Sequence, residues 1–265
     1  MAFEELTARH AQVWSAAPFE KIAEIITEMH VALVDRLAPQ PGEKWLDLGC
    51  GTGELTSKAH VALKVSRSLG SDSSAAMLKK AELAPGVTLE ARDLSTSLPD
   101  GRFDRVISNS AFNWFPDHRT YLPKVISLVT PGGELAVQMP SNNDTPFVKC
   151  SIEAAEQLRT ELKGFTWRPP VEPPEFYAEL LARDERVAES KVGAWYYPQL
   201  HPSVSGLVEF AQGGLLSAYR GRLSPTDFER YCAAYRDALE RAFGNGPVFF
   251  PFRRVFVFAR IKGSA

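Results

Sequence analysis

The fold of this chain is decided by the stretch Lys44-Trp45-Leu46-Asp47-Leu48-Gly49-Cys50-Gly51-Thr52-Gly53. A short apolar strand that carries an acid leads directly into three glycines at alternate positions, and a helical segment follows from Glu54. Glycine has no Cβ, so it lets the backbone turn sharply and lets a ligand approach the backbone amides closely. A strand, a glycine turn and a helix in this order are typical of the nucleotide cradle in a doubly wound α/β sheet.

The spacing of the glycines separates this cradle from a dinucleotide site. A dinucleotide fingerprint reads G-x-G-x-x-G and sets a helix N-terminus against a pyrophosphate. Here the glycines follow the pattern G-x-G-x-G, and Asp47 stands two residues before the first of them. A carboxylate at that place repels a diphosphate, whereas it suits a ligand that carries a cationic amino group.

Polar residues also end the next three candidate strands. Asp72 follows the short strand Ser68–Ser71 and lies nineteen residues after Gly53. An acid about 20 residues beyond the glycines is placed to accept the ribose hydroxyls of a nucleotide. The third strand, Val87–Leu94, contains Asp93, and the fourth, Phe103–Ser110, contains Asn109. Each could be an ordinary turn, because Asp and Asn favour turns, but all of them in this order favour a cofactor site.

These motifs resemble those of the class I S-adenosylmethionine-dependent methyltransferases. In that family the third strand end holds the adenine and the fourth strand end faces the sulfonium. A tryptophan before the first strand, Trp14, either covers the cofactor or packs on the core. The resemblance implies S-adenosylmethionine as cofactor and contacts to it from Trp14, Asp47, Gly49, Cys50, Gly51, Gly53, Asp72, Ser73, Met77, Asp93, Leu94 and Asn109.

Three further stretches, Asn113–His118, Leu128–Pro140 and Phe250–Arg260, are similar to those of trans-aconitate methyltransferases, which methylate a carboxylate of a small polycarboxylic acid. That family tends to carry an arginine after the pair Gly214-Leu215, where this chain has Leu216, and arginines follow only at Arg220 and Arg222. The difference favours a less charged acid. The resemblance implies a small-molecule acid acceptor. From their positions we expect acceptor contacts from Asn113 and Trp114 after the fourth strand, from Trp195, and from Arg253 or Arg254 beside the last strand, where a salt bridge with a surface acid is the alternative for either arginine.

Methyl transfer from a sulfonium is an in-line displacement in which alignment supplies most of the acceleration. A carboxylate acceptor is already ionised at neutral pH, so no catalytic base is assigned. A phenol, amine or enol acceptor would need one, and His118 and His201 are weak candidates that are more readily explained as structural histidines. No group of His, Cys, Asp and Glu has the spacing of metal ligands, so no metal is expected.

Other functions stay open on the sequence alone. The acceptor could be a hydroxyl or enol of a natural product, or the carboxylate of a carrier-bound acyl group. A non-catalytic module that binds S-adenosylmethionine is a more remote alternative, since fold does not determine function. A nucleic-acid methyltransferase is disfavoured, because the chain has no basic track and reads Asn109-Ser110-Ala111-Phe112 after the fourth strand.

The composition is that of an ordinary globular protein, with 265 residues, 45% of them hydrophobic and 23% charged. The net charge of −2 and the lack of a basic block argue against a nucleic-acid or membrane partner. The three cysteines are widely spaced and suggest no disulfide framework. No secretory signal opens the sequence. We therefore expect a cytoplasmic monomer or homodimer.

The expected fold is an α/β, doubly wound, mostly parallel seven-stranded Rossmann-like sheet with a helical cap over its C-terminal edge. Residues 1–42 form an N-terminal helical segment and residues 43–140 the cofactor-binding core. Residues 141–247 form the helical cap, and residues 248–265 the strand that completes the sheet. The triplet Trp195-Tyr196-Tyr197 is assigned to the cap, where it either covers the acceptor or packs in the core.

Overall fold

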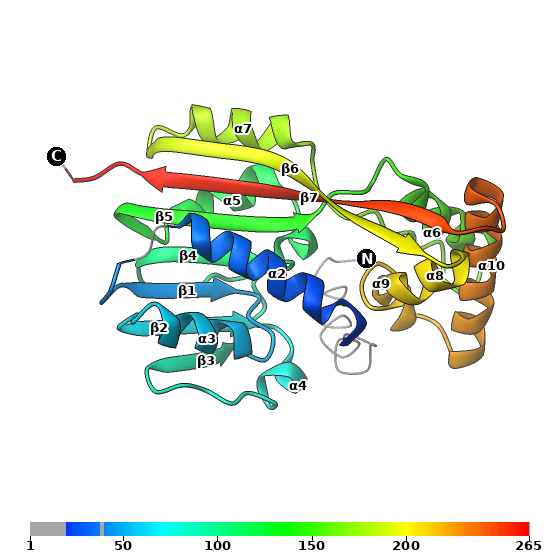
Figure 1. The fold of residues 1–265 in the computed structure, drawn as a ribbon, viewed down its shortest axis with the longest axis horizontal. Helices are drawn as coiled ribbons and strands as arrows, with labels where there is room; N and C mark the ends of the chain where they lie inside the picture. The colour runs from blue at the N-terminus through cyan, green and yellow to red at the C-terminus, as the bar shows by residue number, and fades with distance from the viewer. Residues whose placement is uncertain (1–19, 38–39, 265) are drawn as a thin grey trace.

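The computed structural model describes residues 20–37 and 40–264. Within them seven strands form one sheet in the order β3-β2-β1-β4-β5-β7-β6 (Figure 1). β1 to β5 pair in parallel, whereas β7 runs antiparallel between β5 and β6. This confirms the predicted doubly wound, mostly parallel sheet. The strands are β1 (Lys44–Leu48), β2 (Arg67–Asp72), β3 (Val87–Ala91), β4 (Phe103–Asn109), β5 (Val129–Pro140), β6 (Val187–His201) and β7 (Val248–Ile261).

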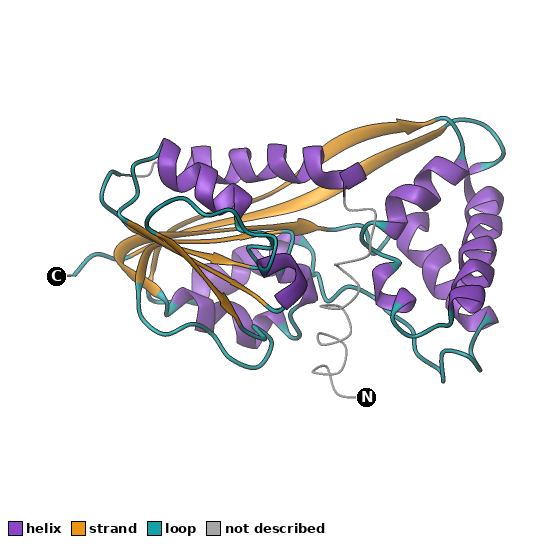
Figure 2. Cartoon of the chain, turned by 90° about the horizontal axis from the view of Figure 1, so that it is seen from below, coloured by secondary structure: helices purple, strands orange, loops and turns teal. Residues whose placement is uncertain are grey.

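Helices cover both faces of the sheet, and a separate group of helices lies beyond the carboxyl ends of β1 to β5 (Figures 1 and 2). The helices beside the sheet are α2 (Glu20–Arg36), α3 (Glu54–Ala62), α4 (Ala75–Leu78), the 3-10 turn η1 (Phe112–Trp114), α5 (His118–Ile126) and α7 (Pro174–Arg183). The second group, called the cap below, contains α6 (Pro146–Gln157), α8 (Val204–Gln212), α9 (Ser217–Arg220) and α10 (Pro225–Phe243).

One apolar stripe of α2 fixes this helix on the sheet. Leu33, Val34 and Leu37 recur at helical spacing and are buried. They form one cluster with Ile107 of β4, Ala136 of β5 and Phe256 of β7. The helix therefore lies across one face of the central strands, as Figure 1 shows, while α5 and α7 pack on the opposite face.

The two longest strands join the sheet to the cap. β6 and β7 pair continuously from Glu189↔Arg260 to His201↔Val248. Near the sheet, Val255 and Val257 of β7 lie in its core. Near the cap, Phe250 stacks on Phe147 of α6 with ring centroids 4.6 Å apart. The same two strands thus contribute to both hydrophobic cores.

Three buried tyrosines fill the cap, and each hydroxyl has a backbone partner. Tyr231 donates to Ser151 O at 2.9 Å and Tyr235 to Phe147 O at 2.8 Å. Tyr219 accepts from Trp167 N at 2.9 Å. Buried hydroxyls without such partners would cost free energy, so this pairing lets aromatic residues occupy the cap interior.

The structure differs from the sequence prediction in residues 141–247, which were predicted as cap. This stretch contains α7, which packs on the sheet, and β6, which is a strand of the sheet. Trp195-Tyr196-Tyr197 therefore lies on β6 and not in the cap. β6 is an edge strand with many exposed polar residues, so its sequence lacks the apolar run of a buried strand. β5 contains the pair Gly132-Gly133, and Gly132 has a φ of +81°. No helix in the described ranges is long and apolar enough to cross a membrane.

Candidate active site

The strand order brings the predicted cofactor residues to one edge of the sheet. β3, β2, β1 and β4 are neighbours and parallel, so their carboxyl ends lie side by side. Asp72 and Asn109 end β2 and β4, Asp93 follows β3 by two residues, and Asp47 is the last residue but one of β1. Ligands of doubly wound sheets bind at this edge.

The loop between β1 and α3 requires its glycines. Gly49, Gly51 and Gly53 have φ values of +83°, +61° and +71°, which side chains with a Cβ rarely adopt. A Cβ on Gly49 would lie 2.1 Å from the Cβ of Ala111, so the loop after β4 leaves it no space. The loop is therefore tightly packed, and its glycine amides donate to Ser71 O, Asp72 Oδ2 and Cys50 O.

Asp72 organises this loop from the neighbouring strand. Its Oδ2 accepts from Gly51 N at 2.8 Å and its Oδ1 from Ser74 N at 2.8 Å. Burial raises the pKa of Asp72, and the amide hydrogen bonds oppose that rise. The side chain thus holds the glycine loop and the start of α4 together at the position expected for a ribose contact.

Asp47 is a buried acid with an unsatisfied oxygen. Its Oδ2 accepts from Thr56 Oγ1 of α3 at 2.6 Å, whereas its Oδ1 has no hydrogen-bond partner in the described structure. Burial raises the pKa of Asp47 to about 7; the bond from Thr56 opposes this, and the negative charge of Asp72 adds to it. An unpaired buried oxygen costs free energy, and a cationic ligand group would satisfy it.

The remaining predicted cofactor residues surround this loop. Asp93 accepts from Ser95 through both its backbone N and its Oγ, at 2.9 and 2.6 Å. The Met77 side chain lies next to Gly51: a Cβ on Gly51 would be 3.3 Å from the methyl carbon of Met77. Cys50 is half-buried, Leu94 is buried and Ser73 is exposed. Trp14 lies outside the described residues.

On the other side of Asn109, a hydrogen-bond network crosses three strands. Arg254 of β7 donates through Nε to Gln138 Oε1 of β5 at 2.8 Å, and through Nη2 to Ser110 Oγ. Gln138 Nε2 donates in turn to Asn109 Oδ1 and, at 2.8 Å, to Ser110 Oγ. Ser110 has a φ of +62°, a strained value for a residue with a Cβ. The network joins the predicted cofactor edge to β7.

Arg254 is buried without a neutralising acid. Its side chain is 3% exposed, and none of the described carboxylates forms an ion pair or hydrogen bond with it. Burial lowers the pKa of Arg254 to about 9, so the guanidinium still carries its charge at neutral pH. Nη1 makes no hydrogen bond to any described residue. One edge of the guanidinium is therefore available for an anion.

The neighbouring arginine is already engaged. Arg253 donates through Nε to Ser141 O at 2.6 Å and through Nη2 to Asp144. Its backbone N also donates to Asn142 Oδ1 at 3.0 Å. Alternation along β7 points the two arginines to opposite faces of the strand. Arg253 thus anchors the loop after β5, while Arg254 faces the α2 side.

The two tryptophans predicted to contact the acceptor lie in different surroundings. Trp195 pairs with Arg254 across β6 and β7 and is 38% exposed. The Arg36 guanidinium lies 4.5 Å from its ring centroid. Trp114 stacks on Trp167 with centroids 5.4 Å apart, which links η1 to the cap. Asn113 is buried directly before Trp114.

The cap arginines that follow Gly214-Leu215 lie on aromatic rings. The Arg220 guanidinium is 4.4 Å from the Phe228 ring centroid, and Nη2 donates to Gln212 Oε1 at 3.1 Å. The Arg222 guanidinium is 3.8 Å from the Phe165 ring centroid. Both guanidinium groups thus pack on aromatic rings of the cap, while Arg220 Nε has no hydrogen-bond partner in the described structure.

His118 has a partner at each ring nitrogen. Nδ1 lies 2.6 Å from Tyr177 Oη, and Nε2 lies 3.0 Å from Phe112 O. A carbonyl only accepts, so Nε2 carries the proton and Nδ1 accepts from the tyrosine. Burial lowers the pKa of His118 to about 4. The neutral ring has no free lone pair with which to take a proton.

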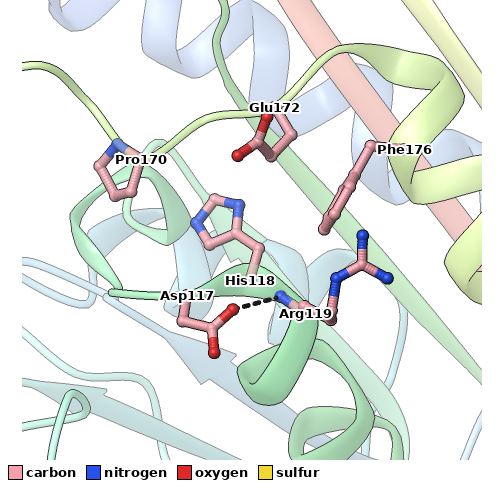
Figure 3. Close-up of a pocket in the computed structure, with 6 residues that line it drawn as sticks. All are labelled: Asp117, His118, Arg119, Pro170, Glu172 and Phe176. Carbon is pink, nitrogen blue, oxygen red and sulfur yellow. Dashed lines mark hydrogen bonds between the residues drawn. The ribbon is translucent and has the colours of Figure 1, made fainter.

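A polar pocket of about 340 Å³ opens beside His118 (Figure 3). It is formed by the start of α5 and the segment before α7, on the side of the sheet opposite to α2. Asp117 accepts there from Arg119 N and Thr120 Oγ1, and the Arg119 guanidinium lies 4.8 Å from the Phe176 ring centroid. The lining residues are Asp117, His118, Arg119, Pro170, Glu172 and Phe176. The pocket does not include the cofactor edge or Arg254.

His201 lies far along β6 from the strand ends. It pairs with Val248, six residues from Arg254 on β7, and its Nε2 lies 3.0 Å from Gln199 Oε1. A strand rises about 3.3 Å per residue, so His201 is roughly 20 Å from Arg254. In the part of the chain that the structure describes, no group of three or more His, Cys, Asp and Glu side chains could hold a metal ion.

Sequence reasoning missed Gln138 and Ser110 as members of the site. Gln138 is the only amide in the apolar run Leu135–Met139 and is fully buried. Buried polar side chains nearly always have partners, so a lone Gln in a central strand was a usable signal. The strained Ser110 gives no such signal, because serine is common in loops.

Comparisons with known proteins give related results for sequence and fold. A methyltransferase domain model matches residues 39–173. A trans-aconitate 2-methyltransferase from Deinococcus radiodurans is 37% identical over 231 residues, which cover 83% of this chain and 87% of that protein. Another, from Azoarcus sp. (strain BH72), is 31% identical over 252 residues, 93% of this chain and 98% of that protein. The YcgJ protein from Bacillus subtilis superimposes with a TM-score of 0.58 at 15% identity, over 89% of this chain and 98% of that one.

Proposed function

The chain belongs to the S-adenosylmethionine-dependent methyltransferase family that includes the trans-aconitate 2-methyltransferases, and from this premise we propose that it methylates a carboxylate of a small organic acid. One observation carries the proposal. Arg254 holds a buried positive charge, with no acid to neutralise it among the described residues, beside the strand ends that carry the cofactor motifs. A carboxylate is the ligand group that an arginine fork matches best.

The residues at the strand ends suit the cofactor. The glycine loop lets a ligand approach without meeting side chains, Asp72 offers carboxylate oxygens for ribose hydroxyls, and the unpaired Oδ1 of Asp47 suits a cationic amino group. S-adenosylmethionine supplies an electrophilic methyl group when bound. Asn109, at the end of β4, links the cofactor residues through Gln138 to Arg254. This link supports adjacent positions for cofactor and acceptor.

The chain's own contribution to the chemistry is placement. Arg254 would bind the acid, Gln138 and Ser110 would fix the guanidinium, and the aromatic residues Trp114 and Trp195 would exclude water around the acceptor. A carboxylate needs no deprotonation at neutral pH. The full engagement of both nitrogens of His118 agrees with a reaction that uses no base. With saturating cofactor, kcat should therefore be nearly flat from about pH 6.5 to 8.5.

The proposal is tested with methyl-labelled cofactor and a panel of acceptors. Trans-aconitate comes first, because the relatives are named for it. Citrate, succinate, butyrate and phenylacetate follow. Catechol and ethanolamine represent hydroxyl and amine acceptors. We expect label on at least one acid, in a product that releases methanol in mild alkali, as a methyl ester does. Turnover of phenols or amines alone, with alkali-stable products, would contradict the proposal. The cytoplasmic setting and the choice between monomer and homodimer stay predictions from composition.

A further inference from the structure

A second buried polar group without a partner lies on the α2 side of the sheet. His30 of α2 is 4% exposed, and its Nε2 has no hydrogen-bond partner among the described residues. Unsatisfied buried groups are rare in native proteins and call for an explanation. Arg254, on the same side, also lacks a partner for one edge of its guanidinium. A buried imidazole nitrogen and one edge of a guanidinium, both on the α2 side, thus have no protein partner among the described residues.

The packing register places His30 at the level of the active-site network. Leu33 and Val34 of α2 pack in one cluster with Ile107 and Ala136. The helix approaches the cap, and with it the carboxyl ends of the strands, as its numbering falls, because Met29 lies in the cap core (Figure 1). One helical turn earlier is His30, and the next residues on the same face of β4 and β5 are Asn109 and Gln138. The step of one helical turn to His30 is 5.4 Å, and the step of two strand residues to Asn109 and Gln138 is about 6.6 Å. His30 therefore lies at about the same level as these two residues.

No hydrogen bond joins His30 Nε2 to Arg254 in the described structure. Burial alone lowers the pKa of His30 to about 4, with no contribution from a neighbouring charge. The ring is therefore neutral at pH 7. Tyr197 packs against both the cap cluster that contains Met29 of α2 and the cluster that contains Leu33. A ligand that contacts both His30 Nε2 and the open edge of Arg254 must span the distance between them.

We propose that His30 is a second acceptor-binding residue, whose Nε2 hydrogen-bonds a polar group at the opposite end of the acid that Arg254 holds. This inference rests on the proposed function and narrows it. The acceptor class is a bifunctional acid, with one carboxylate for Arg254 and a second carboxylate or a hydroxyl for His30. A neutral imidazole can donate to the first or accept from the second, without adding a charge to the site.

The test compares two acids that differ only at the second end. Succinate and butyrate have the same four-carbon chain, and only succinate carries a second carboxylate. We would measure KM for each acid, or the inhibition constant where an acid is not turned over, in the wild type and in His30→Leu. We expect the constant for succinate to rise about tenfold in the variant and that for butyrate to change by less than about twofold.

His60→Leu serves as the matched control. His60 is also a buried histidine, but its Nδ1 lies 3.0 Å from Ser68 Oγ at the opposite edge of the sheet. We expect it to lower the melting temperature and to leave the ratio of succinate to butyrate constants unchanged. In His30→Leu the melting temperature should hold or rise, because an unsatisfied buried group is removed.

The ratio decides the outcome. If the ratio of the succinate constant to the butyrate constant in His30→Leu stays within twofold of the wild-type ratio, His30 does not bind the acceptor. The same conclusion follows if His60→Leu changes this ratio as much as His30→Leu does. A wild type that binds succinate no better than butyrate would also overturn the role of His30. If the wild type forms methyl esters and the ratio does not move, only this inference fails. If no acid is esterified at all, the proposed function fails with it.

Discussion

Arg254 Nε and Gln138 Oε1 are 2.8 Å apart, so a neutral amide and not an acid holds the buried guanidinium. An amide fixes the direction of the side chain and leaves its charge uncompensated. Burying such a charge costs several kcal/mol, whereas a paired carboxylate would recover part of that cost. The protein thus retains a destabilising charge at the position where the proposed acceptor binds.

Replacing Arg254 with methionine should separate binding from stability. We expect kcat/KM for the acid to fall by about 10- to 150-fold, the equivalent of the 1.5–3 kcal/mol of a charged hydrogen bond. The melting temperature should hold or rise, because an uncompensated buried charge is removed. Steady-state kinetics and thermal unfolding measure the two effects. Arg253→Met is the control: it should lower the melting temperature, because it frees the loop that Ser141 and Asp144 anchor, and leave KM unchanged.

The cofactor cradle can be tested by calorimetry with S-adenosylhomocysteine. Asp72→Ala should weaken binding by about 1–3 kcal/mol, because it leaves ligand hydroxyls unpaired. Gly51→Val should abolish binding, since a β-branched residue is strained at a φ of +61° and fills the space beside the backbone. Both variants should show native circular dichroism. A folded Gly51→Val protein with normal affinity would show that the cofactor binds elsewhere.

Cofactor affinity should depend on pH through Asp47. Its pKa is raised by burial to about 7 in the ligand-free protein, so the folded form takes up a proton between about pH 4 and 7 that the unfolded chain does not. The contribution of this group to stability therefore falls as the pH rises through that window. A cationic ligand group favours the carboxylate, so the affinity for S-adenosylhomocysteine should increase between about pH 6 and 8. Asp47→Asn should bind more weakly and remove this slope.

His118 should prove structural. His118→Phe would leave Tyr177 Oη and Phe112 O without their partners, which costs about 1–3 kcal/mol for each unsatisfied buried group. We expect a lower free energy of unfolding in urea, with kcat unchanged well below the midpoint. A loss of kcat in a variant of normal stability would instead assign His118 a part in the chemistry.

The cofactor edge could be predicted from sequence because its determinants are local. A strand, three alternate glycines and acids at the next strand ends are each readable within a few residues, and parallel pairing then assembles them. β6 could not be predicted, because an edge strand with exposed polar residues has no distinct pattern. The sequence also gives no sign that Arg254 lacks an acid, since Arg253 and Arg254 look alike there and strand alternation alone separates them.

The position of β7 has a consequence for how the protein is made. β7 follows every other described strand and the entire cap in the chain, yet it lies between β5 and β6 and carries residues of both cores. Until its residues leave the ribosome, β6 has no strand partner and α6 lacks the phenylalanines against which it packs. A nascent chain that stops before Val248 therefore exposes an unpaired strand and an open apolar surface. When β7 is complete, it pairs with β6 and covers the apolar surface of the cap in the same step.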